Sequence, residues 1–232
     1  MKKIIKATSK KLPMGVSLWM HKIHHVYGKN DYPYRKYCHK FEAIFVHIPK
    51  CAGTSVLSML MGDTLFRDHL TYMEFKQANP YLYERYFKFC FVRNPYERLV
   101  SAYTYLSAGG NGKDDLYFKE LFREKYPSFE DFVLYFLDSS VIHEHKLFKP
   151  QYLYVCNIKK ELMVDYVGKL ENIDKDIIVI KKRLGISTDL IKANTSPKQD
   201  SSNYYTNKKV SDKVFELYKH DFSVFEYEKL LR

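Results

Sequence analysis

The chain has 232 residues, of which 46% are hydrophobic and 28% are charged, a composition that suits one sizeable globular domain with a buried core. We expect no membrane-spanning helix, because no apolar run approaches the roughly 18 residues that such a helix needs. The first residues are basic but have no apolar stretch behind them, so no signal peptide is predicted. Four cysteines without a Cys-x-x-Cys pair favour free thiols over a zinc site and indicate a reducing, cytoplasmic location.

The formal net charge of +11 is concentrated near the N-terminus. Residues 1–40 contain ten Lys and Arg residues and one acid, Asp31, which gives this segment a net charge of +9. We therefore expect a basic extension over 1–40 and a single domain over 41–232. Such an extension favours an acidic partner, such as a polyanionic acceptor or the anionic surface of the inner membrane, and a solvated arm is the alternative. No helix-turn-helix, zinc-finger or RNP motif is present, so no specific nucleic acid partner is predicted.

The first chemically informative stretch follows a buried strand predicted over 43–48. Lys50 and Gly53 then occupy a tight loop, and a helix is expected to begin at Thr54 or Ser55. Backbone N–H groups of such a loop and of the helix start point inward, and the lysine adds a full positive charge. The pattern therefore predicts a site for phosphate or sulfate. An ordinary strand–turn–helix corner with a solvent-exposed lysine is the alternative.

This stretch differs from the ATP- and GTP-binding P-loop, whose pattern is Gly-x4-Gly-Lys-[Ser/Thr]. Here Lys50 precedes Gly53 instead of following it, and no first glycine lies upstream. The loop therefore has the features of an anion-binding site but lacks the sequence pattern that is typical of nucleoside triphosphate binding.

A second strand is predicted over 87–93, followed by a proline turn and a helix over 96–106. Arg93 lies at the end of this strand, where a guanidinium group can grip a phosphate through paired N–H groups. Ser101 lies two turns into the helix and adds a hydroxyl group. We therefore expect two anion cradles at neighbouring strand ends, an arrangement that suits one ligand with phosphate-type groups at both ends.

The rest of the chain alternates helical segments with one more strand. Helices are predicted over 114–126, 129–137, 173–184 and 211–220, and a third strand is predicted over 165–170. This alternation predicts an α/β protein with a P-loop-like three-layer fold, in which helices flank a central, mainly parallel sheet. Ligands of such sheets lie at the carboxyl ends of the strands.

The two cradles carry long motifs, His-Ile-Pro-Lys-Cys-Ala-Gly-Thr-Ser over 47–55 and Phe-Val-Arg-Asn-Pro-Tyr-Glu-Arg-Leu-Val-Ser-Ala-Tyr over 91–103. They closely resemble the two signatures of the Golgi-type and bacterial carbohydrate sulfotransferases, and the segment 69–75 between them resembles the heparan sulfate 2-O-sulfotransferase branch. Further matches lie at 149–153, 166–172 and 218–227, so the resemblance covers about residues 41–228.

The resemblance implies a donor, 3′-phosphoadenosine 5′-phosphosulfate (PAPS), and transfer of its sulfuryl group to a hydroxyl of a glycan or glycolipid without a metal ion. The first motif would hold the 5′-phosphosulfate through Lys50, Cys51, Ala52, Gly53, Thr54 and Ser55. Arg93 and Ser101 would hold the 3′-phosphate. Lys50 would also stabilise the charge on the bridging oxygen as the sulfuryl group leaves. Lys198 belongs to a segment that resembles the loop closing over the donor in this family.

The resemblance also implies a general base for the acceptor hydroxyl. Residues 69–75 resemble the segment that carries a catalytic histidine in the heparan sulfate 2-O-sulfotransferase branch, which makes His69 the predicted base. His47 is expected to be a buried core histidine. The alternatives for the base are His145, His143, Glu74 and Glu171.

Two other functions stay open from the sequence. A P-loop kinase acting on a nucleoside or a sugar would need ATP, Mg²⁺ and an acidic metal ligand, which the sequence does not place near either cradle. A non-catalytic protein that binds polyanions or membrane surfaces would depend on residues 1–40 rather than on Lys50. The sequence predicts neither the acceptor and its sulfated position nor the oligomeric state.

Overall fold

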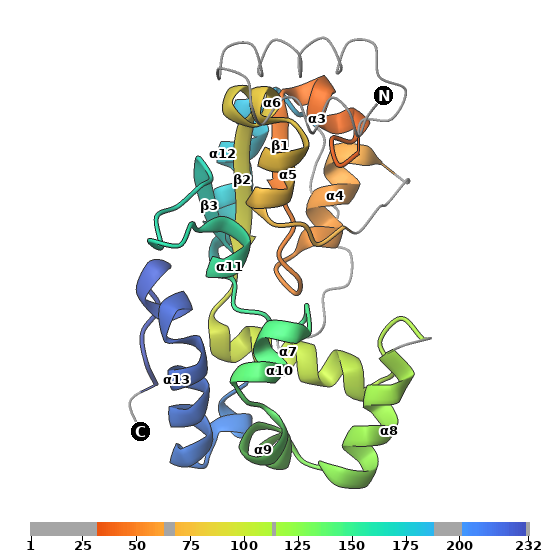
Figure 1. Ribbon diagram of the computed structural model, residues 1–232, viewed down its shortest axis with the longest axis vertical. Coiled ribbons are helices and arrows are strands. Elements are labelled where there is room, and N and C mark those ends of the chain that lie inside the picture. The colour runs from red at the N-terminus through yellow and green to blue at the C-terminus, as the bar shows by residue number, and fades with distance from the viewer. Residues whose placement is uncertain (1–31, 63–67, 113–114, 188–200, 231–232) are drawn as a thin grey trace, which may run out of the picture.

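The computed structural model of the protein describes residues 32–62, 68–112, 115–187 and 201–230. Most of the predicted basic extension lies outside these residues, as does Lys198. The described residues form an α/β structure in which helices flank a parallel sheet (Figure 1). The predicted fold class is confirmed.

The sheet of the described residues has three parallel strands in the order β1 (Ala43–Val46), β2 (Phe87–Val92) and β3 (Tyr166–Lys169). β1 is buried along its whole length and β2 from its second residue onward. This is the pattern of parallel strands that are covered on both faces. Because the three strands run in one direction, their carboxyl ends meet at one edge of the sheet.

Helices connect the strands and cover the sheet. They are α3 (Lys36–Phe41), α4 (Gly53–Met61), α5 (Tyr72–Ala78), α6 (Pro80–Arg85), α7 (Pro95–Ser107), α8 (Asp115–Lys125), α9 (Phe129–Asp131), a π-helical turn (Phe132–Phe136), α10 (Ser139–Glu144), α11 (Tyr152–Val155), a 3₁₀ turn (Leu170–Asn172), α12 (Ile173–Leu184), a second 3₁₀ turn (Ser201–Tyr205) and α13 (Lys208–Val224). In the view of Figure 1, α12 lies behind the sheet, whereas α5 and α6 lie in front of it.

Two clusters of buried apolar side chains stabilise the molecule. The first surrounds the sheet and includes Phe89, Phe91 and Val92 of β2. The second joins α7 to α8, α9, α10 and α13 and is rich in aromatic rings, among them Phe122 and Phe132. Figure 1 shows that β2 points toward the helices of the second cluster. The carboxyl ends of the strands therefore lie at the junction between the two cores.

Several helix boundaries differ from the predictions. The sequence predicts no helix at α10, which begins where the carboxylate of Asp138 accepts hydrogen bonds from the backbone N–H groups of Ser140 and Val141. The helix predicted over 129–137 divides into α9 and the π-helical turn. α13 begins before residue 211 because the side chain of Asn207 caps it.

The core also includes residues upstream of Phe41. Tyr34, Tyr37 and Cys38 are buried within the first cluster. The hydroxyl of Tyr34 donates to the carbonyl oxygen of Phe75 at 2.9 Å, which ties this segment to α5. This end of the predicted extension is therefore packed against the domain.

The loop after β1 has a curled backbone. Lys50 and Ala52 have φ angles of 68° and 59°, in a left-handed region that costs a non-glycine residue about 1–2 kcal/mol. Such conformations turn successive N–H groups to one side, as in anion-binding nests. Gly53 is required for packing, because a Cβ atom there would lie 1.7 Å from Nε2 of His47. The loop thus rests directly on the imidazole of His47, which is buried as predicted.

Replacing Gly53 by alanine should lower the free energy of unfolding by about 1–3 kcal/mol, because the new methyl group would overpack against His47. Ala52→Gly is the matched control. Relief of the left-handed alanine equals or exceeds the loss of backbone entropy, so this variant should be as stable as the wild type or slightly more stable. Urea unfolding followed by circular dichroism measures both changes. A Gly53→Ala protein as stable as the wild type would contradict the packing of this loop on His47.

Candidate active site

The first cradle lies where β1 leads into α4. Nζ of Lys50 lies 4.2 Å from the centroid of the Tyr105 ring, a cation–π contact with α7. Burial lowers the pKa of Lys50 to about 8, and the positive charges of Arg93 and Arg98 also lower it. α4 has nine residues, and its first turn presents N–H groups without intrahelical acceptors at the positive end of the helix dipole. An anion at this loop would meet both the ammonium group and the helix N-terminus.

Two buried side chains accompany this loop. Nε of Arg98, on α7, donates a hydrogen bond of 3.0 Å to the carbonyl oxygen of Pro49. The side chain of Arg98 is almost fully buried, and its Nη2 has no hydrogen-bond partner among the described residues. Burial raises the pKa of the Cys51 thiol to about 12, so the thiol stays protonated and is a poor nucleophile. Cys51 therefore contributes to the loop by its packing and its backbone.

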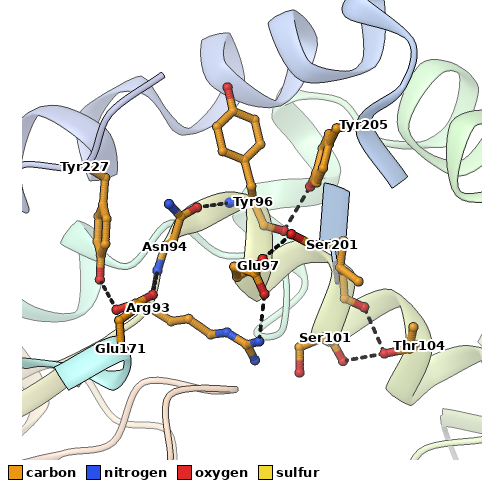
Figure 2. A network of polar contacts seen from close by, with 11 residues as sticks. Arg93, Asn94, Tyr96, Glu97, Ser101, Thr104, Glu171, Ser201, Tyr205 and Tyr227 are labelled. Atoms are coloured by element: carbon orange, nitrogen blue, oxygen red, sulfur yellow. Dashed lines mark hydrogen bonds and ion pairs between the residues drawn. The ribbon is translucent and has the colours of Figure 1, made fainter. Parts of the chain in front are cut away.

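The second cradle lies where β2 leads into α7. Arg93 follows the strand directly and precedes α7, whereas Glu97 and Ser101 are four residues apart and lie on one face of the helix (Figure 2). Nη2 of Arg93 lies 3.2 Å from Oε2 of Glu97. The hydroxyl of Ser201 donates to Oε1 of the same carboxylate. Glu97 therefore holds the guanidinium group along this face of the helix.

The turn between β2 and α7 is fixed from two sides. The side chain of Asn94 caps α7 by accepting a hydrogen bond of 2.9 Å from the backbone N–H of Tyr96. The backbone N–H of Asn94 donates to Oε1 of Glu171 at 2.6 Å, and the hydroxyl of Tyr227 donates to Oε2 of Glu171 at 3.0 Å (Figure 2). Glu171, one of the alternatives for the base, thus helps to hold this turn.

Gln151 joins the two cradles. Its Oε1 accepts hydrogen bonds from the backbone N–H of Arg93 at 2.9 Å and from Sγ of Cys51 at 3.3 Å. The structure therefore brings the loop of Lys50 and the end of β2 together, as the sequence predicts. Sequence reasoning identified neither Gln151 nor Arg98 as part of the site. Both residues lie in stretches that resemble the family, 149–153 and 91–103, but their partners lie 58, 100 and 49 positions away, so the sequence does not indicate which groups they contact.

His69 lies beside the first loop. Its Nδ1 donates to the carbonyl oxygen of His47 at 3.1 Å, and the centroids of the two imidazole rings lie 4.2 Å apart. With the proton on Nδ1, the lone pair of Nε2 is free to accept a proton. Burial lowers the pKa of His69 to about 4, so the ring is neutral at physiological pH. His69, His47 and Gly53 form a continuous row of contacts from the candidate base to the loop.

The other candidate bases have structural contacts of their own. Glu74 closes the capping box at the start of α5, accepting a hydrogen bond of 2.7 Å from the backbone N–H of Thr71. Nδ1 of His143 donates within α10 to the carbonyl oxygen of Ser139 at 2.6 Å. The ring of His145 packs against Phe118 and Phe148, residues of the second core, and burial lowers its pKa.

In the part of the chain that the structure describes, none of the helices combines the length and apolar character that crossing a membrane requires. Within the same residues, His, Cys, Asp and Glu side chains do not gather in groups of three or more that would suit a metal ion.

Comparison with known proteins supports one family. The model of the sulfotransferase family matches residues 35–228. Carbohydrate sulfotransferase 11 of Rattus norvegicus is 25% identical over 228 residues, covering 80% of this chain and 64% of the rat protein, and the Mus musculus protein of that name matches to the same extent. An uncharacterized protein of Archaeoglobus fulgidus is 32% identical over 116 residues, covering 50% of this chain and 82% of that protein. No solved structure matches the chain significantly.

The chain spans less than two thirds of the length of the rat and mouse proteins that it matches. Those relatives do not single out the heparan sulfate 2-O-sulfotransferase branch. The family match begins at residue 35, within the segment that packs against the core, and it includes both cradles, His69 and Gln151. Since the match extends over most of the sequence, the chain belongs to the sulfotransferase family.

Proposed function

We propose that the protein is a PAPS-dependent sulfotransferase that moves a sulfuryl group to a carbohydrate hydroxyl by in-line displacement. The observation that carries this proposal is the adjacency of two cationic cradles, one at Lys50 and one at Arg93, at neighbouring strand ends. A ligand with anionic groups at both ends of a nucleoside matches that arrangement. The family membership supports the reaction class.

Each cradle would take one end of the donor. The curled loop over 50–55 and the N-terminus of α4 would bind the 5′-phosphosulfate, with Lys50 as its full charge. Arg93 and Ser101 would bind the 3′-phosphate, and Arg93 would do so while still in reach of Glu97. Both ends would then be fixed before the acceptor reacts, which is how positioning contributes to rate.

The reaction requires a base and a stabilised leaving group. His69 would accept the proton of the acceptor hydroxyl at Nε2 as the hydroxyl oxygen bonds to sulfur, and the bond between sulfur and the bridging phosphate oxygen would break. The ammonium group of Lys50 would neutralise the charge that develops on the bridging oxygen. For this the lysine must be charged and the histidine neutral, a pair of states that the two pKa shifts allow near pH 6–7.

The acceptor is proposed to be a glycan or glycolipid, because relatives over most of the chain are named carbohydrate sulfotransferases. A cytoplasmic location, with peripheral contact to an anionic membrane through the basic residues 1–40, is also a proposal. It concerns a segment that lies largely outside the described residues.

Lys50→Ala should lower turnover with PAPS by ~10²–10³-fold, as expected for loss of one preorganised donor. Lys50→Arg gives a sharper test, since a guanidinium group does not titrate in this range. In the wild type kcat/KM should fall as the pH rises through about 8, where Lys50 loses its proton. In Lys50→Arg this decline should disappear.

Transfer of radiolabelled sulfate from PAPS to a panel of polysaccharides measures these rates, and Lys159→Ala, at an exposed position, serves as the control. Unchanged turnover in Lys50→Ala would remove this residue from the mechanism. Failure of the wild type to use PAPS with any acceptor of the panel would count against the proposed function.

Arg93→Ala should weaken binding of adenosine 3′,5′-bisphosphate by ~1.5–3 kcal/mol, the usual contribution of a hydrogen bond to a charged group. This corresponds to roughly 10–100-fold in the dissociation constant measured by isothermal titration calorimetry. Arg123→Ala changes a guanidinium group that is exposed on α8 and should bind normally. Equal affinities for Arg93→Ala and the wild type would show that the 3′-phosphate is held elsewhere.

His69→Ala should lower kcat by ~10²–10⁴-fold, the typical contribution of a general base, and should leave the affinity for adenosine 3′,5′-bisphosphate unchanged. In the wild type, kcat/KM should fall as the pH drops through about 4, where His69 gains a proton. Steady-state assays and calorimetry separate the two effects. Full activity in His69→Ala would transfer the role of the base to another residue, with His145→Ala and His143→Ala as the next variants.

A further inference from the structure

We infer that Gln151 is a positioning residue, whose side-chain amide sets the spacing between the two anion cradles and thereby makes the site selective for a ligand with two anionic ends. The inference rests on the proposed function, since it assigns the two cradles to one donor. Gln151 touches neither proposed end of the donor; it would act through Cys51 and Arg93.

The amide group of Gln151 is fully engaged. Oε1 accepts from the backbone N–H of Arg93 at 2.9 Å, and Nε2 donates to the carbonyl oxygen of Arg93 at 2.8 Å. The same Oε1 accepts from Sγ of Cys51 at 3.3 Å, and Nε2 also lies 3.4 Å from Oδ2 of Asp221. One planar group therefore contacts the first loop, the end of β2 and the last helix.

The two hydrogen bonds between Gln151 and the backbone of Arg93 continue the hydrogen bonding of β2 by one residue beyond the end of the sheet. Pairing between β2 and β1 ends at Val46 and Cys90, and pairing between β2 and β3 ends at Val92 and Lys169. Arg93 is the next residue beyond this ladder. The amide of Gln151 occupies both its backbone N–H and its C=O, as a neighbouring strand would. The backbone of the arginine is thus held at a point where the sheet itself no longer holds it.

Gln151 is itself held from behind by Asp221. Oδ2 of Asp221 accepts from the backbone N–H of Gln151 at 2.8 Å, and Oδ1 accepts from the backbone N–H of Tyr152 at 2.8 Å. Gln151 and Asp221 are both 0% exposed. Water cannot replace the partners of these buried groups, so leaving one of them without a hydrogen bond costs folding free energy. The amide is therefore a rigid spacer rather than an adaptable surface contact.

The first loop has a second attachment, the hydrogen bond from Arg98 to Pro49. It joins the loop to α7 but does not contact Arg93. The turn after Arg93 also has an attachment that does not use Gln151, the hydrogen bond from the backbone N–H of Asn94 to Glu171. Loss of the Gln151 amide should therefore act mainly on the distance between the two cradles, because each keeps one attachment of its own. The binding free energies of two linked sites combine only while the geometry allows both sites to be occupied at once. Removing the amide should consequently weaken binding of a ligand with two anionic ends more than it weakens binding of a ligand with only one.

The test compares three ligands by calorimetry: adenosine 3′,5′-bisphosphate, adenosine 5′-phosphate and adenosine 3′-phosphate. In the wild type the bisphosphate should bind more tightly than the better monophosphate by ~10²-fold or more. In Gln151→Met, which keeps the length of the side chain and removes the amide, this advantage should fall by roughly tenfold or more while the monophosphates keep close to wild-type affinity. Gln77→Met, at an exposed position of α5, should retain the full advantage.

Gln151→Asn is the second variant, and it is used if Gln151→Met does not fold. It keeps the amide chemistry but shortens its reach by one methylene group, so it should lose the advantage of the bisphosphate in the same way. An undiminished advantage in the folded variant overturns the inference alone, as does an equal loss of affinity for all three ligands, which would indicate a general role in stability. If the wild type shows no preference for the bisphosphate, the proposed function fails together with the inference.

Discussion

The site depends on positive charges that are held close together and partly out of water. Lys50, Arg93 and Arg98 lie near enough for the two arginines to lower the pKa of the lysine. Glu97 pairs with Arg93, but Arg98 donates to a backbone carbonyl and Lys50 rests over an aromatic ring. Cations that are largely buried and contact only neutral groups are unfavourable by themselves. An anionic ligand relieves this repulsion, which is the physical reason for assigning the region to a phosphate- and sulfate-bearing molecule.

Holding like charges this close together requires a rigid backbone, because their repulsion would otherwise move the segments that carry them apart. The two cores supply it, since the first fixes the strands and the second fixes α7 and α13 on the other side of the junction. Between them, buried polar side chains carry the connections. Burial raises the pKa of Asp221 to about 6, whereas its hydrogen bonds from Gln151 and Tyr152 favour the carboxylate. Of the three cations, Arg93 is paired with an acid, whereas Lys50 and Arg98 are held by contacts with neutral groups.

The sequence predicts those parts of the fold and the site that depend on local patterns. The two buried strands, the bounds of α12 and the proline turn before α7 follow from residue types at short spacing, and the structure has all of them. The contacts of Gln151, Arg98 and His47 could not be predicted, because each joins segments whose proximity only the folded chain determines. α10 was missed for a different reason: its start depends on a single aspartate cap within an otherwise irregular segment.

Asp221 lies more than a hundred residues downstream of both anion-binding motifs, and this order has a consequence for biosynthesis. A chain emerging from the ribosome presents both anion-binding motifs long before α13 is made, yet the carboxylate that anchors Gln151 arrives only with residue 221. During translation the nascent protein would therefore contain Lys50, Arg93 and Arg98 before Asp221 is available to hold Gln151 in place. The two cradles should therefore reach their final spacing only after α13 has been synthesised and has packed behind Gln151.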